Sequence, residues 1–469
     1  MPSTTMPLTR RQFSYTLCGL PFAFPFKLAA QDTNIEGPWD GPATVAKVYL
    51  ATRPSWPKPD LDIPQEVAEV DARLAEVQRK NARNVRFVGG EVIKTAEEFK
   101  PLAAKMGPID GVLFIPIAHG AAIGPLLDAI NVPALFFSRP YATHAWSGIA
   151  DVRKSGRKID VVASASYGDL DPYMEAFRAA HHLRNSKVMV GVGNPERGRP
   201  AADAFNKQFG VGFRFVSGND LKQAFDAADE RTAQKAADEF TRGALRVIDT
   251  TPEEIRKGLR FYQAMLNMMK QEKANAFAID CFGSLATRTL PGYPCIAWSK
   301  LNDAGLYGVC EADLQSAMTM ILVTGHSGMP GFISDPVFDT SRNEVTHAHC
   351  VSATKMRGLN GPSYPYVVRK HLETNEGAVL QVMMPAGDAV TVARFASPTK
   401  MLVSSAEVTG AVMDSDRGCR TQVRTRVSDA EKWLQNYTAG LHRVLFYGDH
   451  TKDIERMGRL MGFEVVHEI

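Results

Sequence analysis

The sequence predicts an α/β protein with two doubly wound parallel-sheet N-terminal domains and a mixed, largely antiparallel α+β C-terminal domain. Up to residue 275, short apolar runs alternate with amphipathic helical segments, which is typical of a parallel sheet covered by helices. From residue 276 onward, strand-like runs follow one another without long helices, which favours antiparallel pairing. A chain of 469 residues is also too long for one ordinary core.

The composition is that of a globular protein, with 45% hydrophobic and 22% charged residues. Lys and Arg exceed Asp and Glu by only 3, and no basic block or basic-aromatic stripe is present to follow a phosphate backbone. We therefore expect no nucleic-acid partner. Beyond the N-terminal segment, no run reaches the roughly 18 to 20 apolar residues that span a bilayer, so we expect no membrane association of the mature chain.

Residues 1–30 have the outline of a twin-arginine export signal. Residues 9–13 read Thr-Arg-Arg-Gln-Phe, a weakly apolar stretch follows over 15–26, and small residues at 28–30 offer a cleavage site. Two prolines within the apolar stretch depart from the usual pattern, and a disordered basic N-terminus is the alternative interpretation. The pattern predicts export to the periplasm, by a route that carries folded proteins and so permits metal loading before export.

The first α/β domain is predicted over residues 41–150. Apolar runs indicate strands, and amphipathic segments indicate helices; the strands are expected at 45–50, 85–88, 111–116 and 132–137, and the helices at 62–84 and 95–106.

The second α/β domain is predicted over residues 151–275. Its strands are expected at 160–164, 187–193 and 212–215, with a helix at 171–185 and a mostly helical connector at 220–269. The Gly191-Val192-Gly193 segment follows a strand, but Glu196 stands where a dinucleotide fingerprint requires its third glycine. We interpret it as a turn.

The C-terminal domain is predicted over residues 276–469, with strand-like runs at 379–383 and 389–393. Most of the cysteines lie there, and none form a CxxC pair, so neither a zinc ribbon nor a thioredoxin-like motif is supported. The six are Cys18, Cys281, Cys295, Cys310, Cys350 and Cys419. Small buried thiols are the favoured interpretation, and any disulfide pairing stays open.

Four residues of this domain could hold a divalent cation: Glu311, Asp335, His349 and His442. Two carboxylates with one or two imidazoles suit Mn²⁺ and, less exclusively, Mg²⁺, Co²⁺ or Fe²⁺. Each residue also has a structural explanation, because Glu311 lies at a predicted helix start and Asp335 precedes a proline. His347 stands two positions before His349 on an apparent strand, so the two should share a face, and one metal rarely needs both.

The motifs around these residues resemble those of the L-fucose and L-arabinose isomerase family. They occur in the family's order across most of residues 276–450 and read DCFG at 280–283, YPC at 293–295, LNDAG at 301–305, CEAD at 310–313, GMPGFISD at 328–335 and HC at 349–350. The resemblance implies that Glu311 and Asp335 bind Mn²⁺ and form the acid-base pair. It also matches His442 to the late metal-binding histidine and His349 to the histidine of the His-Cys motif.

This chain departs from the named family members in two ways. It is shorter than typical L-fucose isomerases, and its late histidine lies in Leu-His-Arg at 441–443. The sugar is therefore not implied, and we place the chain in a broader branch of the superfamily. The resemblance also implies homo-oligomeric assembly, with sites completed by neighbouring subunits. His119 and Trp146 are candidates for that role, although a loop histidine and an ordinary core or surface indole explain them equally well.

The sequence therefore predicts a Mn²⁺-dependent enzyme that interconverts an aldose and a ketose through an ene-diolate. Two alternatives stay open: an exported sugar-binding protein without catalysis, and a metal-dependent epimerase or lyase acting on a sugar or sugar acid. Arg369, Lys370 and His371 are candidates for contacting the polar ligand, and a solvated strand end is the other interpretation of them.

Overall fold

The computed structural model describes residues 35–52, 56–286 and 289–469. The predicted export signal at 1–30 lies outside these residues. Within the described part of the chain, no helix combines the length and the apolar character needed to cross a membrane.

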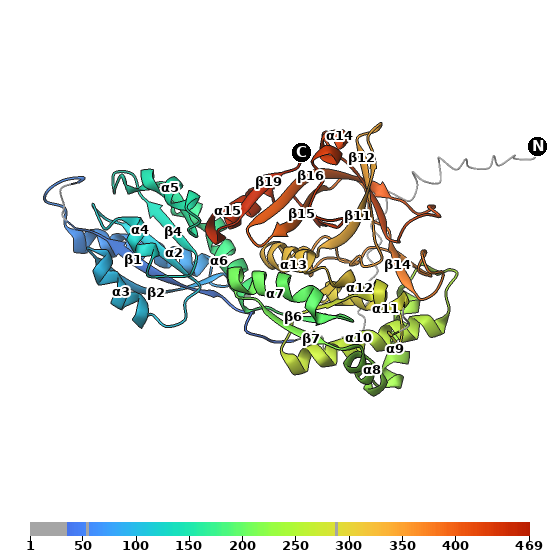
Figure 1. Ribbon diagram of the computed structural model, residues 1–469. Helices are drawn as coiled ribbons and strands as arrows, with labels where there is room; N and C mark the ends of the chain where they lie inside the picture. Colours follow the sequence, from blue (N-terminus) through green and yellow to red (C-terminus); the bar gives the residue numbers. More distant parts are fainter. Residues whose placement is uncertain (1–34, 53–55, 287–288) are drawn as a thin grey trace, which may run out of the picture. The chain divides into compact units, whose positions relative to one another are not determined.

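The first sheet is parallel throughout and confirms the first doubly wound region (Figure 1). Its strand order is β2-β1-β3-β4-β5. The strands are β1 (Ala43–Leu50), β2 (Val85–Ile93), β3 (Gly111–Pro116), β4 (Ala134–Ser138) and β5 (Ile159–Ala163). The helices of this region are α2 (Ile63–Lys80), α3 (Ala96–Lys105), α4 (Ile123–Leu127) and α5 (Ile149–Lys154), with the 3-10 turn η1 (Ala145–Gly148). Because β5 pairs with β4, this sheet extends beyond the expected boundary at residue 150.

The second sheet is also parallel, in the order β10-β9-β6-β7. The strands are β6 (Lys187–Gly191), β7 (Gly212–Val216), β9 (Ala276–Ile279) and β10 (Tyr307–Val309). The accompanying helices are α6 (Asp171–Asn185), α7 (Pro195–Phe209), α8 (Gly218–Ala227), α9 (Glu230–Gly243), α10 (Pro252–Glu272), α11 (Cys281–Ala286) and α12 (Cys295–Asp303), with the 3-10 turn η2 (Tyr167–Leu170). Since β9 and β10 follow residue 275, the expected boundary between residues 275 and 276 divides this sheet.

The third sheet is the predicted largely antiparallel one and closes into a barrel, with β19 paired in parallel to β16 (Figure 1). Its order is β15-β18-β11-β12-β17-β16-β19, and the extra pairing of β15 with β16 closes the first six strands. The strands are β11 (Phe332–Asp339), β12 (Glu344–Ala348), β15 (Ala389–Ser397), β16 (Lys400–Ala411), β17 (Gln422–Arg426), β18 (Arg443–Tyr447) and β19 (Glu464–His467). Helices α14 (Ala430–Asn436) and α15 (Thr451–Met461) and a small sheet of β8 (Arg246–Val247), β13 (Tyr366–Arg369) and β14 (Val379–Val382) complete the fold.

Helix α13 (Leu314–Ser327) joins the second sheet to the barrel. It contacts β10, α6 and β15, and nearly all of its side chains up to Thr324 are buried, as in a helix enclosed by the core. Asp313 caps its N-terminus by accepting a hydrogen bond from the Ser316 N–H at 3.0 Å. The turn that precedes the helix is therefore held between two packed layers.

Candidate metal centre

The four predicted residues come from four chain segments that meet at the start of α13 and one end of the barrel strands. Glu311 lies in the 3-10 turn η3 (Cys310–Ala312), Asp335 lies in β11, His349 follows β12, and His442 precedes β18. Strand β11 lies between β12 and β18, with Asp335 opposite Ala348 and Ser334 opposite Arg443. This register brings residues 335, 349 and 442 together although more than 100 positions separate the first from the last.

The imidazole of His442 lies between the two carboxylates. Its Nε2 is 3.4 Å from Asp335 Oδ1 and 3.5 Å from Glu311 Oε2. His349 Nε2 is 3.9 Å from Glu311 Oε1, and its ring centroid is 5.2 Å from that of His442. Glu311, His349 and His442 each offer one ligand atom within 4.8 Å of the others. Asp335 joins this group through its contact with His442.

The backbone at Glu311 adopts a conformation that side-chain-bearing residues rarely take. Glu311 has φ 57° and ψ 22°, and Ala312 has φ 50°, both in the left-handed region. Such a residue costs about 1–3 kcal/mol and persists only where its surroundings enforce it. Here β10 on one side and the capped start of α13 on the other enforce it, and the turn directs Glu311 toward His442.

Asp313 orients the ring of His442 through a hydrogen bond. Its Oδ2 is 2.8 Å from His442 Nδ1 and 2.5 Å from Arg394 Nη1. Burial alone would raise the pKa of Asp313, but the hydrogen bond from His442 and the charge of Arg394 hold it well below the usual range. The ionised carboxylate accepts a hydrogen bond from the Nδ1–H of His442. In the neutral form of this ring, the lone pair of Nε2 therefore faces Glu311 and Asp335.

His349 has the opposite arrangement. The backbone N–H of Cys350 donates to His349 Nδ1 at 2.9 Å, so the ring proton of the neutral form is on Nε2, facing Glu311. In this tautomer the Nε2–H of His349 faces Glu311 at 3.9 Å, beyond hydrogen-bond distance, and can donate to a bound ligand. It could serve as a metal ligand only in the other tautomer, so its predicted place among the ligands stays a prediction.

The donor set fits a hard or borderline divalent cation. Asp335 Oδ1 and His349 Nε2 are buried and have no hydrogen-bond partner among the described residues. Ligands about 2.1 Å from one ion lie about 3.0–3.4 Å apart in octahedral or tetrahedral geometry, close to the separations around His442 Nε2. The Glu311 side chain is 41% exposed and opens the site to solvent. Burial of its carboxyl group raises its pKa, despite the opposing influence of His442 and His349.

His347 does not reach the centre. It is fully buried, with Nδ1 3.0 Å from Ser334 Oγ and Nε2 3.2 Å from Thr425 Oγ1, and burial lowers its pKa to about 3. The expectation that His347 and His349 share a face assumed a strand that continues past both, but β12 ends at Ala348. One of the two histidines therefore belongs to the barrel interior, and the other to the centre.

Asp313 contacts His442 of the candidate centre and pairs with Arg394, and we did not single out either residue from the sequence. Arg394 is an arginine within a run of buried apolar residues in β15, and its side chain is only 8% exposed. A buried arginine requires a charged partner, which is the signal that could have identified the pair. Arg369 pairs with Asp249. His119 and Trp146 are exposed, and their contribution to a neighbouring subunit's site stays a prediction.

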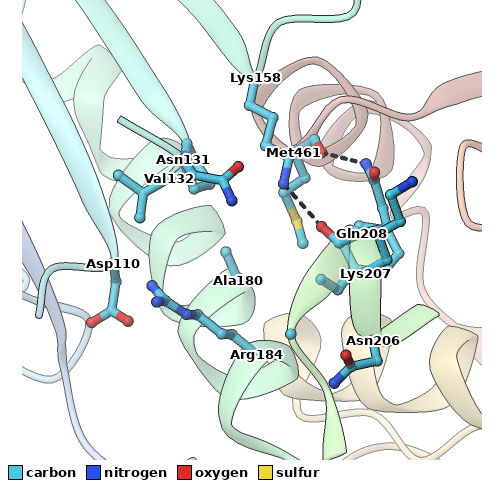
Figure 2. Close-up of a pocket in the computed structure, with 13 residues that line it drawn as sticks. Asp110, Asn131, Val132, Lys158, Ala180, Arg184, Asn206, Lys207, Gln208 and Met461 are labelled. Atoms are coloured by element: carbon cyan, nitrogen blue, oxygen red, sulfur yellow. Dashed lines mark hydrogen bonds between the residues drawn. The ribbon is translucent and has the colours of Figure 1, made fainter. Parts of the chain in front are cut away.

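A cavity of about 200 Å³ lies elsewhere, lined by residues that include Asp110, Lys158 and Arg184 (Figure 2). These three charged groups already have protein partners. Asp110 accepts from the Thr44 N–H at 2.8 Å, and Lys158 and Arg184 donate to the carbonyl oxygens of Gln208 and Ile109 at 2.9 Å each. No residue of the metal centre lines this cavity, so we do not assign it to the same site.

The chain is similar to several curated proteins and matches no protein-family model. It is 28% identical over 183 residues to a sulfoquinovose isomerase of Clostridium sp. (strain MSTE9), covering 37% of this chain and 40% of that protein. It is 23% identical over 257 residues to the sulfoquinovose isomerases of Priestia aryabhattai and Priestia megaterium, covering 52% of this chain and 56% of each. The matched region thus spans about half the length of these relatives.

Proposed function

We propose that this protein is a metal-dependent sugar isomerase that interconverts an aldose and a ketose. The observation that carries the proposal is the convergence of two carboxylates, Glu311 and Asp335, on Nε2 of His442 at 3.5 and 3.4 Å. The similarity to proteins named sulfoquinovose isomerase supports the same reaction class. Sulfoquinovose is accordingly the first substrate to test, followed by neutral aldoses.

The reaction moves two protons between neighbouring atoms of the sugar. The proton on C2 of the aldose goes to C1, and the hydroxyl proton of O2 goes to O1, through an ene-diolate. Two groups that accept and return protons are therefore needed. A divalent cation held by Glu311, Asp335 and His442, with Mn²⁺ first and Mg²⁺ or Co²⁺ next, would stabilise the negative charge that develops on the two oxygens.

We assign the carbon-bound proton to Glu311 and the hydroxyl proton to Asp335. Glu311 reaches farther into solvent, with a side chain 41% exposed against 29% for Asp335, so it meets an incoming sugar first. The raised pKa of Glu311 makes its carboxylate a stronger base than an exposed glutamate. The ring of His349 faces Glu311 at 3.9 Å, and its charge opposes the rise in the pKa of that carboxyl group.

The first experiment compares wild type with Glu311→Gln in a screen of sugars with added Mn²⁺. Glutamine keeps the size of the side chain but cannot carry the proton, so we expect turnover to fall by at least about a hundredfold, in line with loss of a general base. Glu464→Gln is the matched control because this glutamate lies on β19 of the same sheet and its side chain is 62% exposed. Full activity of Glu311→Gln would refute the assignment.

The same screen separates the two other interpretations. An epimerase would return the C2 epimer and a lyase would return fragments, whereas an isomerase returns the ketose. A binding protein would retain the sugar unchanged, and it would need no convergent acid-base pair. Export and homo-oligomeric assembly stay predictions from the sequence.

A further inference from the structure

A second cluster of metal-ligating side chains lies beside the metal centre. It consists of four buried residues, Cys295, Cys350, His371 and Cys419, which we call the thiol cluster. Cys295 begins α12, Cys350 follows β12, His371 follows β13, and Cys419 precedes β17. Four segments widely separated in the sequence therefore place three sulfurs and one imidazole in the same part of the interior.

Three ligand atoms of the thiol cluster are close enough to share one ion, and the fourth, Cys419 Sγ, lies close to His371. Cys295, Cys350 and His371 each offer an atom within 4.8 Å of the other two, and the sulfurs of Cys295 and Cys350 are 3.5 Å apart. Cys419 Sγ is 3.9 Å from His371 Nε2. Glu373 extends the cluster toward the surface, with its Oε1 3.4 Å from Cys419 Sγ.

These distances suit a tetrahedral ion better than a disulfide. A disulfide needs sulfurs about 2.05 Å apart, whereas Cys295 and Cys350 are separated by 3.5 Å. Two thiolates bound to Zn²⁺ at about 2.3 Å in a tetrahedron lie about 3.8 Å apart. The imidazole of His371 also has an orienting partner, because Thr374 Oγ1 lies 3.3 Å from its Nδ1 and leaves Nε2 directed at Cys419.

We propose that the thiol cluster binds one soft or borderline divalent cation of the Zn²⁺ class, with Cys295, Cys350, Cys419 and His371 as ligands. Three sulfurs and one nitrogen form the Cys₃His set of closed structural zinc sites. Thiolates select against Mn²⁺ and Mg²⁺, so the thiol cluster and the carboxylate centre take different ions. The inference is independent of the proposed isomerase activity, because Glu311, Asp335 and His442 do not belong to the thiol cluster.

The thiol cluster also bears on the position of His349. Cys350 is its chain neighbour, and the backbone N–H of Cys350 fixes its Nδ1 at 2.9 Å. An ion that holds the sulfur of Cys350 would hold this N–H and thereby the ring that faces Glu311. The zinc ion would then act as a positioning element for His349 and take no part in the reaction.

The test uses the full chain and zinc or cobalt alone as the probe. We expect zinc at about one ion per chain by elemental analysis, retained in the Glu311→Gln variant. After zinc is removed with a chelator and replaced by Co²⁺, we expect the near-ultraviolet thiolate-to-cobalt charge-transfer absorption. Cys295→Ser should lose this absorption. Cys281→Ser is the matched control because Cys281 is a buried thiol that lies 2.9 Å from Cys310 and outside the thiol cluster.

Alkylation of the wild-type protein gives a second readout that needs no variant. If the thiol cluster holds zinc, iodoacetamide should label Cys295, Cys350 and Cys419 only after the chelator is added, as mapped by peptide mass spectrometry. Labelling independent of chelator, a charge-transfer band that survives in Cys295→Ser, or a Cys295–Cys350 disulfide would each overturn the proposal. If the wild-type protein shows the expected zinc content, cobalt absorption and alkylation pattern but no isomerase activity, only the proposed function is contradicted.

Discussion

The Asp313→Asn substitution tests whether Asp313 prepares His442 for metal binding. Asp313 Oδ2 accepts from His442 Nδ1 at 2.8 Å and from Arg394 at 2.5 Å, and both its side chain and that of Arg394 are at most 10% exposed. Asparagine keeps the shape but removes the charge, and its amide can donate to Nδ1 and shift the ring proton to Nε2. The lone pair that faces Glu311 and Asp335 would then be lost.

Two magnitudes follow from these contacts. Loss of the group that orients a metal-binding histidine weakens metal affinity by about 10- to 100-fold. Loss of one member of a buried ion pair costs about 3–5 kcal/mol of unfolding free energy. Arg394 keeps hydrogen bonds to the Ala439 carbonyl at 2.8 Å and Ser316 Oγ at 2.9 Å, so we expect the lower end of that range.

Metal is first removed with a chelator, and a calorimetric titration with Mn²⁺ then measures the Mn²⁺ affinity. Urea unfolding measures the free energy of unfolding. The double variant Asp313→Asn with Arg394→Gln separates the two effects. It removes the unpaired guanidinium and should recover part of the stability, but not the Mn²⁺ affinity. Wild-type Mn²⁺ affinity in Asp313→Asn would refute the orienting role, as would recovery of affinity in the double variant.

Two further predictions concern the scaffold. Burial lowers the pKa of His182 to about 4, so the unfolded chain binds one more proton than the folded chain between about pH 4 and 6.5. Stability should therefore fall as pH decreases through this window, by about 3 kcal/mol in total, and His182→Gln should flatten the dependence in urea unfolding. Gly308→Ala places a Cβ 2.7 Å from the backbone Cα of Trp298, and we expect the free energy of unfolding to fall by about 1–3 kcal/mol. Mn²⁺ binding should also weaken, because β10 leads into the turn that carries Glu311. An unchanged melting temperature in Gly308→Ala would contradict this packing.

The alternation of strands and helices predicted the two parallel sheets, because buried parallel strands appear as short apolar runs. The strands at the limits of each sheet were harder to predict from the sequence. Strand β5 belongs to the first sheet and β9 to the second, and both assignments depend on long-range pairing that leaves no local mark in the sequence. Closure of the antiparallel sheet by β15 and β16 is likewise a tertiary property.

The candidate site residues could be identified from the sequence chiefly through the motifs around them. Taken alone, Glu311 appeared to be a helix-start carboxylate, and its left-handed backbone is visible only in three dimensions. The distinction between His442 and His349 was also hidden, since it depends on Asp313 for one ring and on the Cys350 N–H for the other. The cysteines showed no spacing motif because each ligand of the thiol cluster comes from a different segment.

Hydrogen exchange at the sugar carbon tests the proposed function most directly. The protein is incubated in D₂O with the best substrate found in the screen, with Mn²⁺ or after chelation, and deuterium at C1 and C2 is followed by NMR. We predict incorporation in the Mn²⁺-loaded wild type, and none after chelation or in Glu311→Gln, whose fold is checked by its melting temperature. Deuterium incorporation by the protein after metal removal, or by Glu311→Gln at the wild-type rate, would contradict a metal-assisted proton transfer through Glu311.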